Sequence, residues 1–563
     1  MKKALATVMA MATLGCAMMG AACGGPEVID KVDETKTTLR IANYNGGVGE
    51  KWLDNLADRF EDKVKDEVFE EGKKGVQVII DHQKNYSGKE LGNSLKADTN
   101  NHLYFTQALD YNMMASQGLL ADITDLVKDT TGEDGKKIVD KLNANKKSYL
   151  EKDGKYYAIP HYELYNGLQY DAGVFKEKKL YFSDVIRSDG TRGFVANDTA
   201  KKSPGPDGKY NTYDDGLPSS YEEFYTLLKQ MKSNGVIPFV WTGKSTHYTN
   251  MLVSTLFANY IGKDGFDVLF NYEEKEIEIV TNYAGGVVQT EMQKLNKDTA
   301  YKVKGSAAMY YALEFCQKVF SKGENYSEGG YTCTGANFSH IQAQQKLWFS
   351  GLDGEESKVA MLIDGNYSYN EAADAGTIEQ AKTNFSAAFD QKDIRYMPMP
   401  VQYEGTVTEG KGKAPVLVDC YQSYAFINAN TSGASMDAAK AFLSYAYTDE
   451  QMQKFTLETN GIMKGVSYDL SAIEESDELC SNGKYMLQMR KAAEQAGTLI
   501  YPFTGRSEFL KNAAKFNLST GGDFWAADSQ TIMFNAFNSG TMTAAQYFEQ
   551  VQLTASEWQA IIA

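Results

Sequence analysis

The chain has 563 residues and a mass of 62.4 kDa, which is too long for one ordinary hydrophobic core and predicts at least two domains. Its 57 basic and 74 acidic residues give a net charge of −17, which argues against binding to a nucleic-acid backbone, because such binding needs a basic surface. After the first 25 residues no apolar run is long enough to span a bilayer, which excludes a polytopic membrane protein.

The N-terminus has the pattern of an export signal. Two lysines are followed by an apolar stretch over residues 4–19 and by small residues directly before Cys23. This arrangement resembles the signal of bacterial lipoproteins, in which the cysteine becomes the lipidated first residue. We therefore expect residues 1–22 to be a signal peptide, Cys23 to carry the lipid and residues 23–36 to form a flexible linker. Cys16 is an alternative acceptor, and a plain secretory signal is the other interpretation.

Four further cysteines leave the disulfide pattern open. Cys316, Cys333, Cys420 and Cys480 allow three pairings, and the sequence does not choose among them. No C-x-x-C motif occurs, which argues against a zinc ribbon or a thioredoxin-type site. Cys316 lies on an apolar helical stripe, which favours a buried thiol, and a bridge to Cys333 is the alternative.

The first part of the mature chain alternates between strand and helix. Residues 39–42 and 76–80 have the pattern of strands, and apolar residues recur every three or four positions over residues 53–68. This alternation predicts an α/β domain with a largely parallel sheet, in which ligands bind at the loops after the strands. Tyr44 and Tyr86 lie among Asn and Gly in two such loops.

Residues 187–218 are rich in Gly, Asp, Ser, Pro and Lys and have the composition of an insertion. Within them the segment 203–216 resembles the calcium loops of some bacterial extracellular proteins. The carboxylate and amide side chains of this segment belong to Asp207, Asn211, Asp214 and Asp215. Ca²⁺ prefers six to eight oxygen ligands, so we expect a structural Ca²⁺ here. The alternative is a solvated turn, because nearby lysines dilute the negative charge.

The remainder of the chain carries no recognisable catalytic motif. There is no H-E-x-x-H and no G-x-S-x-G, and the five histidines are not spaced for zinc. Residues 405–411 approximate a phosphate-binding loop, but Gly412 replaces the required Ser or Thr. Residues 219–223 contain a helix-capping pattern, and the last 130 residues are strongly helical, notably over 436–455 and 541–552. We therefore expect a protein that is not an enzyme.

The order of these segments resembles the extracellular solute-binding proteins of carbohydrate ABC importers, the class that includes maltose-binding protein. The resemblance covers nearly the whole mature chain, and its pieces are weak individually but specific together. They are residues 156–160 followed by 167–171, residues 359–367, residues 439–450, residues 524–525 and residues 540–545. Where the class usually has a tryptophan after its Ile-x-Gly element, this chain has Tyr367, and the chain is longer than most members.

The resemblance implies a two-lobed α/β fold with discontinuous lobes joined by crossing hinge strands. Lobe one would comprise residues 37–162 and 418–475, and lobe two residues 165–415 and 478–563. Closure of the lobes on a ligand is the mechanism of the class. The closed form is the shape that the permease recognises. The implied protein is a monomer that is anchored to the bacterial cell membrane on its outer side by the lipid alone, with no catalytic cofactor.

A sugar presents apolar faces and hydroxyl edges, so its site needs flat aromatic rings and side chains that accept and donate hydrogen bonds. Several loops that match the class offer this mixture. The candidate ligand-binding residues are Tyr44, Tyr86, Glu163, Trp241, Asp364, Tyr367, Tyr421 and Trp525. For each of them, packing in the core is the alternative.

Three functions fit the sequence. The first is a lipid-anchored binding protein that delivers a carbohydrate, in particular an oligosaccharide, to an ABC permease. The second is a surface-anchored carbohydrate-active enzyme, and the third is a glycan-binding surface protein with no role in transport. We expect the first, because the resemblance and the 36 tyrosines favour sugar binding. The sequence does not specify the sugar, its linkage or its length.

Overall fold

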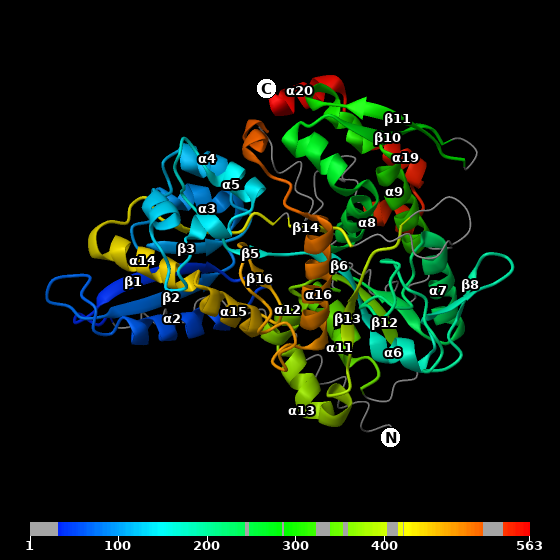
Figure 1. Cartoon of the computed structure of the whole chain (residues 1–563), viewed down its shortest axis with the longest axis horizontal. Coiled ribbons are helices and arrows are strands. Elements are labelled where there is room, and N and C mark those ends of the chain that lie inside the picture. Colours follow the sequence, from blue (N-terminus) through cyan, green and yellow to red (C-terminus); the bar gives the residue numbers. More distant parts are fainter. Residues whose placement is uncertain are drawn as a thin grey trace.

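The structure is a computed structural model of the chain, and it describes residues 32–242, 247–283, 287–321, 338–352, 358–401, 415–419, 421–510 and 533–563. Its elements form two α/β lobes, each built around its own sheet. Figure 1 shows lobe one on the left and lobe two on the right. Both lobes use segments from distant parts of the chain, so the expected two-lobed α/β fold is confirmed.

Lobe one is built on a five-stranded sheet with the order β2-β1-β3-β15-β4. Its strands are β1 (Thr37–Tyr44), β2 (Val76–Gln83), β3 (Leu103–Thr106), β4 (Ile159–Pro160) and β15 (Tyr424–Ile427). β1 runs parallel to β2 and β3, whereas β15 runs antiparallel to β3 and β4. The carboxyl ends of β1 and β2 therefore lie at one edge of the sheet, where the loops with Tyr44 and Tyr86 begin.

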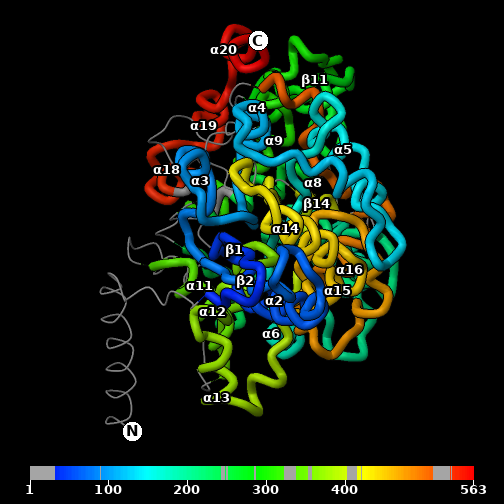
Figure 2. Tube along the Cα trace, turned by 90° about the vertical axis from the view of Figure 1, so that its left-hand side faces the viewer, coloured from blue at the N-terminus to red at the C-terminus, as the bar shows by residue number. Residues whose placement is uncertain are grey.

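Helices cover lobe one because each presents an apolar stripe to the sheet or to a neighbouring helix. In α2 (Lys51–Lys63) the buried side chains include Trp52, Leu56 and Phe60, which recur at helical spacing. α14 (Gly433–Ala446) contacts β1 and α2, and α15 (Asp449–Glu458) packs on α2, as Figure 2 shows. The remaining helices of this lobe are α3 (Gly88–Leu95), α4 (Tyr111–Ser116) and α5 (Ala144–Leu150).

Lobe two is built on a four-stranded sheet with the order β13-β6-β12-β9. Its strands are β6 (Asn166–Asp171), β9 (Ile237–Val240), β12 (Val359–Gly365) and β13 (Ile394–Met397). β12 is buried at all seven positions, as expected of a central strand covered on both faces. It runs parallel to β9 and antiparallel to β6.

The helices of lobe two come from the middle and the end of the chain. They are α6 (Ala172–Glu177), α7 (Tyr221–Ser233), α8 (His247–Phe266), α9 (Ala307–Phe320), α11 (His340–Phe349), α12 (Ser368–Asp374), α13 (Thr377–Phe389), α16 (Ser481–Ala496), α18 (Met533–Ser539), α19 (Ala544–Gln550) and α20 (Ala555–Ile562). The expected cap of α7 is present, because the Ser220 hydroxyl accepts a hydrogen bond from the backbone N–H of Glu223. α16 packs on β13, and α18 and α19 pack on α9.

Short strands connect the lobes. β5 (Tyr162–Glu163) pairs with β16 (Met463–Lys464), and both lie between the two sheets in Figure 1. A second short pair joins β14 (Leu417–Val418) to β17 (Leu499–Ile500). Two antiparallel hairpins project from lobe two, namely β7 (Phe182–Ile186) with β8 (Arg192–Phe194) and β10 (Lys275–Asn282) with β11 (Gln289–Leu295). The predicted insertion 187–218 begins inside the first of these hairpins.

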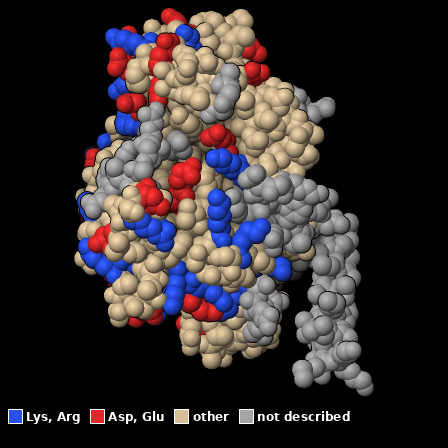
Figure 3. All heavy atoms as spheres, turned by 90° about the vertical axis from the view of Figure 1, so that its right-hand side faces the viewer, with Lys and Arg blue, Asp and Glu red and all other residues tan. Residues whose placement is uncertain are grey.

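The described residues also bear on the membrane and cysteine predictions. None of their helices has the length and apolarity needed to cross a bilayer. Figure 3 shows acidic and basic side chains interspersed over one face of lobe two. Cys316 is a fully buried free thiol in α9, as its helical stripe predicted, and Cys480 is also free. Cys23, Cys333 and Cys420 lie outside the described residues.

Candidate ligand-binding site between the lobes

The lobes touch where the loop after β1 meets the N-terminal end of α12. A Cβ atom placed on Gly47 of lobe one would lie 2.9 Å from the Tyr367 side chain of lobe two. Within α12 itself, Asn370 Nδ2 donates a 2.8 Å hydrogen bond to the carbonyl oxygen of Thr459, which follows α15 of lobe one. The structure therefore shows the lobes closed against each other at α12.

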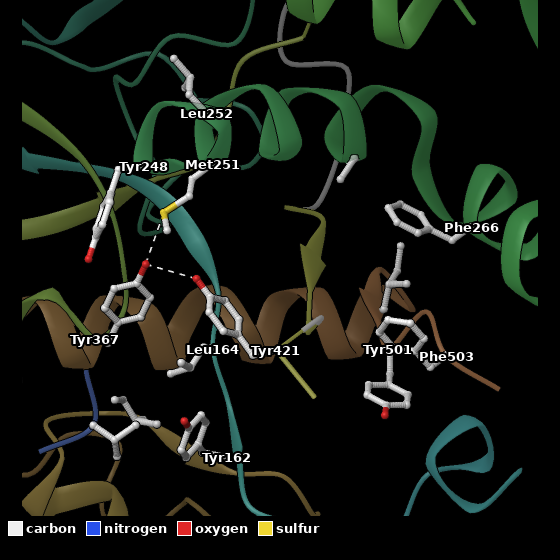
Figure 4. Close-up of a cluster of buried hydrophobic side chains, with 14 of the residues drawn as sticks. Tyr162, Leu164, Tyr248, Met251, Leu252, Phe266, Tyr367, Tyr421, Tyr501 and Phe503 are labelled. Carbon is white, nitrogen blue, oxygen red and sulfur yellow. Dashed lines mark hydrogen bonds between the residues drawn. The ribbon is translucent and has the colours of Figure 1, made fainter. Parts of the chain in front are cut away.

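Two of the predicted aromatic residues meet beside this contact. The hydroxyl oxygens of Tyr367 and Tyr421 lie 3.2 Å apart, and their ring centroids are 6.0 Å apart. Tyr367 Oη also lies 3.3 Å from Met251 Sδ of α8, and Tyr421 donates to Asn166 Oδ1 at 2.9 Å. Figure 4 shows their hydroxyl groups pointing toward each other, below the helix that carries Met251. Tyr421 lies on the segment that leads from β14 to β15, so these bonds tie lobe two to a crossing segment.

Two carboxyl groups lie on the lobe-two side of the contact. Asp364 is the penultimate residue of β12, and Glu371 lies one helical turn after Tyr367. Gln344 of α11 joins them, because its Nε2 donates to Asp364 Oδ2 at 3.0 Å and to Glu371 Oε2 at 2.8 Å. Burial raises the pKa of Asp364 well above its usual range, and the charge of Glu371 raises it further. Burial also raises the pKa of Glu371, to about 7.

Aromatic rings border the carboxyl groups. The Tyr248 hydroxyl lies 3.3 Å from Glu371 Oε2, and the Tyr248 ring stacks on His340 with centroids 5.2 Å apart. Burial raises the pKa of Tyr44 of lobe one, and the charge of Glu371 of lobe two raises it further. The side chain of Glu371 remains 18% exposed and that of His340 31%. We call Asp364, Glu371, Gln344, Tyr248 and His340 the acid cluster.

The acid cluster and the nearby tyrosines combine flat rings with hydrogen-bonding oxygens. Rings of this kind pack against apolar C–H faces, and carboxylates and hydroxyls bind hydroxyl groups. The arrangement therefore suits a ligand that has both surfaces. Of the predicted residues, Tyr44, Asp364, Tyr367 and Tyr421 lie in this region, although Asp364, Tyr367 and Tyr421 are 5% exposed or less.

Glu163 lies in a buried charge network at the crossing strands. Its carboxylate accepts from Lys146 Nζ at 3.0 Å and from Arg490 Nε at 2.9 Å, and Lys146 also pairs with Asp419 at 3.0 Å. Burial alone would raise the pKa of Glu163, but the charges of Arg490 and Lys146 outweigh it and lower the pKa to about 2. The network joins α5, β5 and α16, so Glu163 links these three elements at the crossing strands. Its carboxylate oxygens already accept hydrogen bonds within this network.

Three other predicted residues lie away from the acid cluster or outside the description. Tyr86 packs edge-on against Tyr104 and donates to Asp81, all within lobe one. Trp241 has no exposed surface and packs on Phe320, so it lies in the core of lobe two and not at the lobe boundary. Trp525 lies outside the described residues.

Four members of the acid cluster were not predicted, although the sequence holds a signal for some of them. His340 and Gln344 are four residues apart on one helix, and Tyr367 and Glu371 have the same spacing, so each pair lies on one helical face. Nothing in the sequence indicates that α11 and α12 lie side by side. Tyr248 lies in the first turn of α8, and its spacing in the sequence does not distinguish it from a residue of the core.

The loop 203–216 contains two facing carboxyl groups. Asp214 is completely buried, its Oδ1 accepts from the Thr212 hydroxyl at 2.7 Å, and its Oδ2 accepts from the Asp207 N–H at 2.9 Å. Burial raises the pKa of Asp214, and the charge of Asp207 raises it further, to about 7. Asp215 accepts from the Asn211 N–H at 2.9 Å. Across the described ranges, no three His, Cys, Asp or Glu side chains are arranged to hold a metal, so calcium binding by this loop stays a proposal.

Comparison with models of protein families and with curated protein sequences gives no match. Comparison with solved structures gives matches along nearly the whole chain. A chitin oligosaccharide binding protein is 16% identical with a TM-score of 0.51, and the match covers 93% of this chain and 99% of that one. The GacH receptor of Streptomyces glaucescens is 12% identical with a TM-score of 0.51, covering 94% and 99%. Maltose-bound MalE3 of T. maritima is 13% identical with a TM-score of 0.50, covering 93% and 99%.

The chain has the two-lobed solute-binding fold. At these identities the likeness shows the fold alone, and it does not assign a ligand. In this fold the region between the lobes, where the tyrosines and the acid cluster lie, is the part whose shape changes when the lobes move.

Proposed function

We propose that the chain is the lipid-anchored substrate-binding component of an ABC importer. It captures a carbohydrate, in particular an oligosaccharide, between its lobes and delivers it to the permease by hinge closure. The observation that carries the proposal is the set of tyrosines and carboxyl groups at the contact between the lobes. It is supported by the ligands named for the similar structures, which are a chitin oligosaccharide, acarbose and maltose.

The proposed closure of the two lobes is supported by the positions of the contacts between them. Gly47 approaches Tyr367, and Asn370 bonds to Thr459, across the boundary between lobes. Opening breaks these contacts and exposes the rings, which a sugar then covers when the lobes close again. A ligand that contacts both lobes binds the closed arrangement more tightly and so shifts the population toward it.

The decisive experiment is a thermal-shift screen of the mature chain against a panel of oligosaccharides. A ligand that binds only the folded state raises the melting temperature. Tyr367→Ala should then weaken binding of the hit by about 2 kcal/mol or more, because it removes a buried ring at the centre of the site. Tyr210→Ala, at an exposed ring on the insertion, is the matched control.

The same samples distinguish the two alternative functions. New reducing ends that accumulate over time would indicate a surface-anchored carbohydrate-active enzyme. Binding of a glycan without any change in the radius of gyration would indicate a surface glycan-binding protein with no hinge closure. A panel that produces no shift would contradict carbohydrate binding altogether.

The anchor is tested separately from the ligand. One acyl chain holds a protein only weakly, at about 0.8 kcal/mol per buried CH₂ group, so a lipidated Cys23 is expected to carry more than one chain. Cys23→Ala should release a monomeric chain into the extracytoplasmic fraction, whereas Cys16→Ala should leave it at the membrane. Full membrane retention of the unlipidated Cys23→Ala protein would refute the assignment.

A further inference from the structure

The acid cluster brings two carboxyl groups together with few donors and few positive charges among the described residues. Asp364 is 1% exposed, and its bonds come from Gln344 and from the N–H of Gly365. Among the described residues, the one basic side chain within ion-pair distance of Glu371 is His340, whose Nε2 lies 3.9 Å from Oε2 and which carries a positive charge only when it is protonated. Burying two carboxyl groups this close together is costly unless a proton or a cation is shared between them.

Gln344 provides a second, independent indication of a missing donor. Its side chain is completely buried, and its Nε2 bonds to both carboxyl groups, so the amide faces the acid pair. Its Oε1 has no hydrogen-bond partner among the residues that the structure describes. Buried acceptors are satisfied in nearly all native structures, so an unpaired one beside two carboxyl groups indicates a ligand that donates hydrogen bonds.

The cluster is reachable from the space between the lobes. The Glu371 side chain keeps 18% of its surface, and its charge raises the pKa of Tyr44 of lobe one. Burial is the largest effect on the pKa of Glu371 and raises it. The positive charge of Lys84 of lobe one lowers this pKa, and the negative charge of Asp374 raises it. A ring such as Tyr44 attracts a cation that lies over its face. Across the described residues, no three His, Cys, Asp or Glu side chains form a metal-binding group.

We propose that the saccharide carried by this protein bears a protonated amine, and that Asp364 and Glu371 bind the ammonium group with Gln344 Oε1 accepting one of its hydrogen bonds. An ammonium group supplies a positive charge and three donors, which are the two things that the cluster lacks. This inference rests on the proposed function, because it names the class of sugar that the same interlobe site takes.

The test compares sugars that differ at one position. β-1,4-linked oligomers of glucose, N-acetylglucosamine and glucosamine, matched in length, present a hydroxyl, an acetamido or an amino group on the same carbon. Calorimetry near neutral pH should give an affinity for the glucosamine oligomer about tenfold or more above the other two, because charge-assisted hydrogen bonds are about twice as strong as neutral ones. The glucosamine oligomer alone should release protons on binding, because an ammonium group favours the ionised form of Glu371.

Variants then assign the preference to the cluster. Glu371→Gln should reduce the preference for the amino sugar to within about threefold, since it removes the charge and keeps the shape. Asp364→Asn should do the same, which covers the case in which one variant does not fold. Glu379→Gln, at an exposed position of α13, should keep the full preference.

The outcomes separate this inference from the proposed function. Equal binding of all three oligomers would overturn the inference and leave carbohydrate binding intact. Binding of neutral sugars alone would also overturn it. If no glycan in the broader panel binds, both the proposed function and the inference fail.

Discussion

At the scale of single residues, Gly47 has the clearest role in bringing the lobes together. Its missing side chain lets the loop after β1 approach Tyr367, where a Cβ atom would lie 2.9 Å from the tyrosine side chain. Contacts that short do not occur in folded proteins, so the ring or the lobe would have to move. Because Tyr367 is buried and bonded to Tyr421, moving the lobe is the easier response.

We therefore predict that Gly47→Ala disfavours closure. Ligand affinity should fall by roughly tenfold, since overpacking costs about 1–3 kcal/mol and acts only on the closed form. The melting temperature of the protein without ligand should change little. Calorimetry and small-angle scattering measure the two effects, with Gly193→Ala in the β7–β8 hairpin as the control. Unchanged affinity would show that the loop yields without cost.

The residue types in the sequence indicated which chemistry the ligand site would use better than they indicated where each predicted residue would lie in the fold. Tyr367 is a predicted ligand residue and lies at the lobe contact, in the loop after a strand that the resemblance implied. Trp241 was expected there too, but β9 is apolar throughout, so nothing in the sequence showed which way a residue at its end would face. Glu163 was a candidate ligand residue because its loop matches the class. Its ion pair with Arg490 was not predictable, since Arg490 is 327 positions away in the sequence.

At the scale of elements, the buried charge network ties three segments to one another at the hinge. Lys146 lies on α5, Glu163 on β5 and Arg490 on α16, and each of these side chains is almost fully buried. Removing one partner of such a group leaves the others buried without compensation, which is far costlier than the net contribution of the intact pair.

Glu163→Gln should lower the free energy of unfolding by about 3–5 kcal/mol. The folded-state pKa of Glu163 is lowered to about 2 from 4.5, so its contribution is complete above about pH 4.5 and is lost as the pH falls toward 2. The variant should therefore lose part of the acid sensitivity of the wild type. Denaturant unfolding across this pH range measures both effects. Glu494→Gln removes an exposed partner of Arg490 and should cost below about 1 kcal/mol.

The loop 203–216 gives a second prediction at this scale. The pKa of the buried Asp214 is raised from 3.8 to about 7, so the loop is most stable below about pH 4 and loses stability as the pH rises through 7. A bound Ca²⁺ would offset the charge of Asp214 and Asp207. We expect added Ca²⁺ to raise the melting temperature and to protect the loop from protease above pH 7.

Asp214→Ala should abolish the calcium response, whereas Asp189→Ala in the neighbouring hairpin turn should preserve it. If chelation and Ca²⁺ addition give identical melts and identical cleavage, the loop is a solvated turn. The buried Asp214 would then be held mainly by the Thr212 hydroxyl and the Asp207 N–H.

Periodic elements were predictable, and their ends were less so. The strand–helix–strand pattern of β1, α2 and β2 appears as expected. The helix stops at Lys63, however, and Val68, expected on its buried face, is 63% exposed. The stretch predicted to be helical over 436–455 contains parts of two helices, because the backbone leaves the helical region at Thr448, the residue before α15. The backbone angles of one residue divide the two helices, and amino-acid composition does not reveal such a break.

At the scale of the whole molecule, the resemblance and not the periodicity predicted how the segments assemble. Alternating strands and helices are compatible with many α/β arrangements, and nothing local indicates that β15 inserts between β3 and β4. The network around Glu163 and the contacts around Tyr367 depend on that assembly. The acid cluster, which draws on three helices and a strand, was for the same reason invisible in the sequence.

The late arrival of β15 has a consequence for the newly made chain. β3 and β4 are complete by Pro160, but the strand that lies between them begins only at Tyr424. At a synthesis rate of about 5–20 residues per second, roughly 13–50 s pass before that strand exists. During this interval β3 has one edge without a partner. This strand has the sequence Leu-Tyr-Phe-Thr and is buried at all four positions in the finished fold. Such an edge readily pairs with another chain, so we expect the nascent protein to be prone to misassembly until its own missing strand emerges.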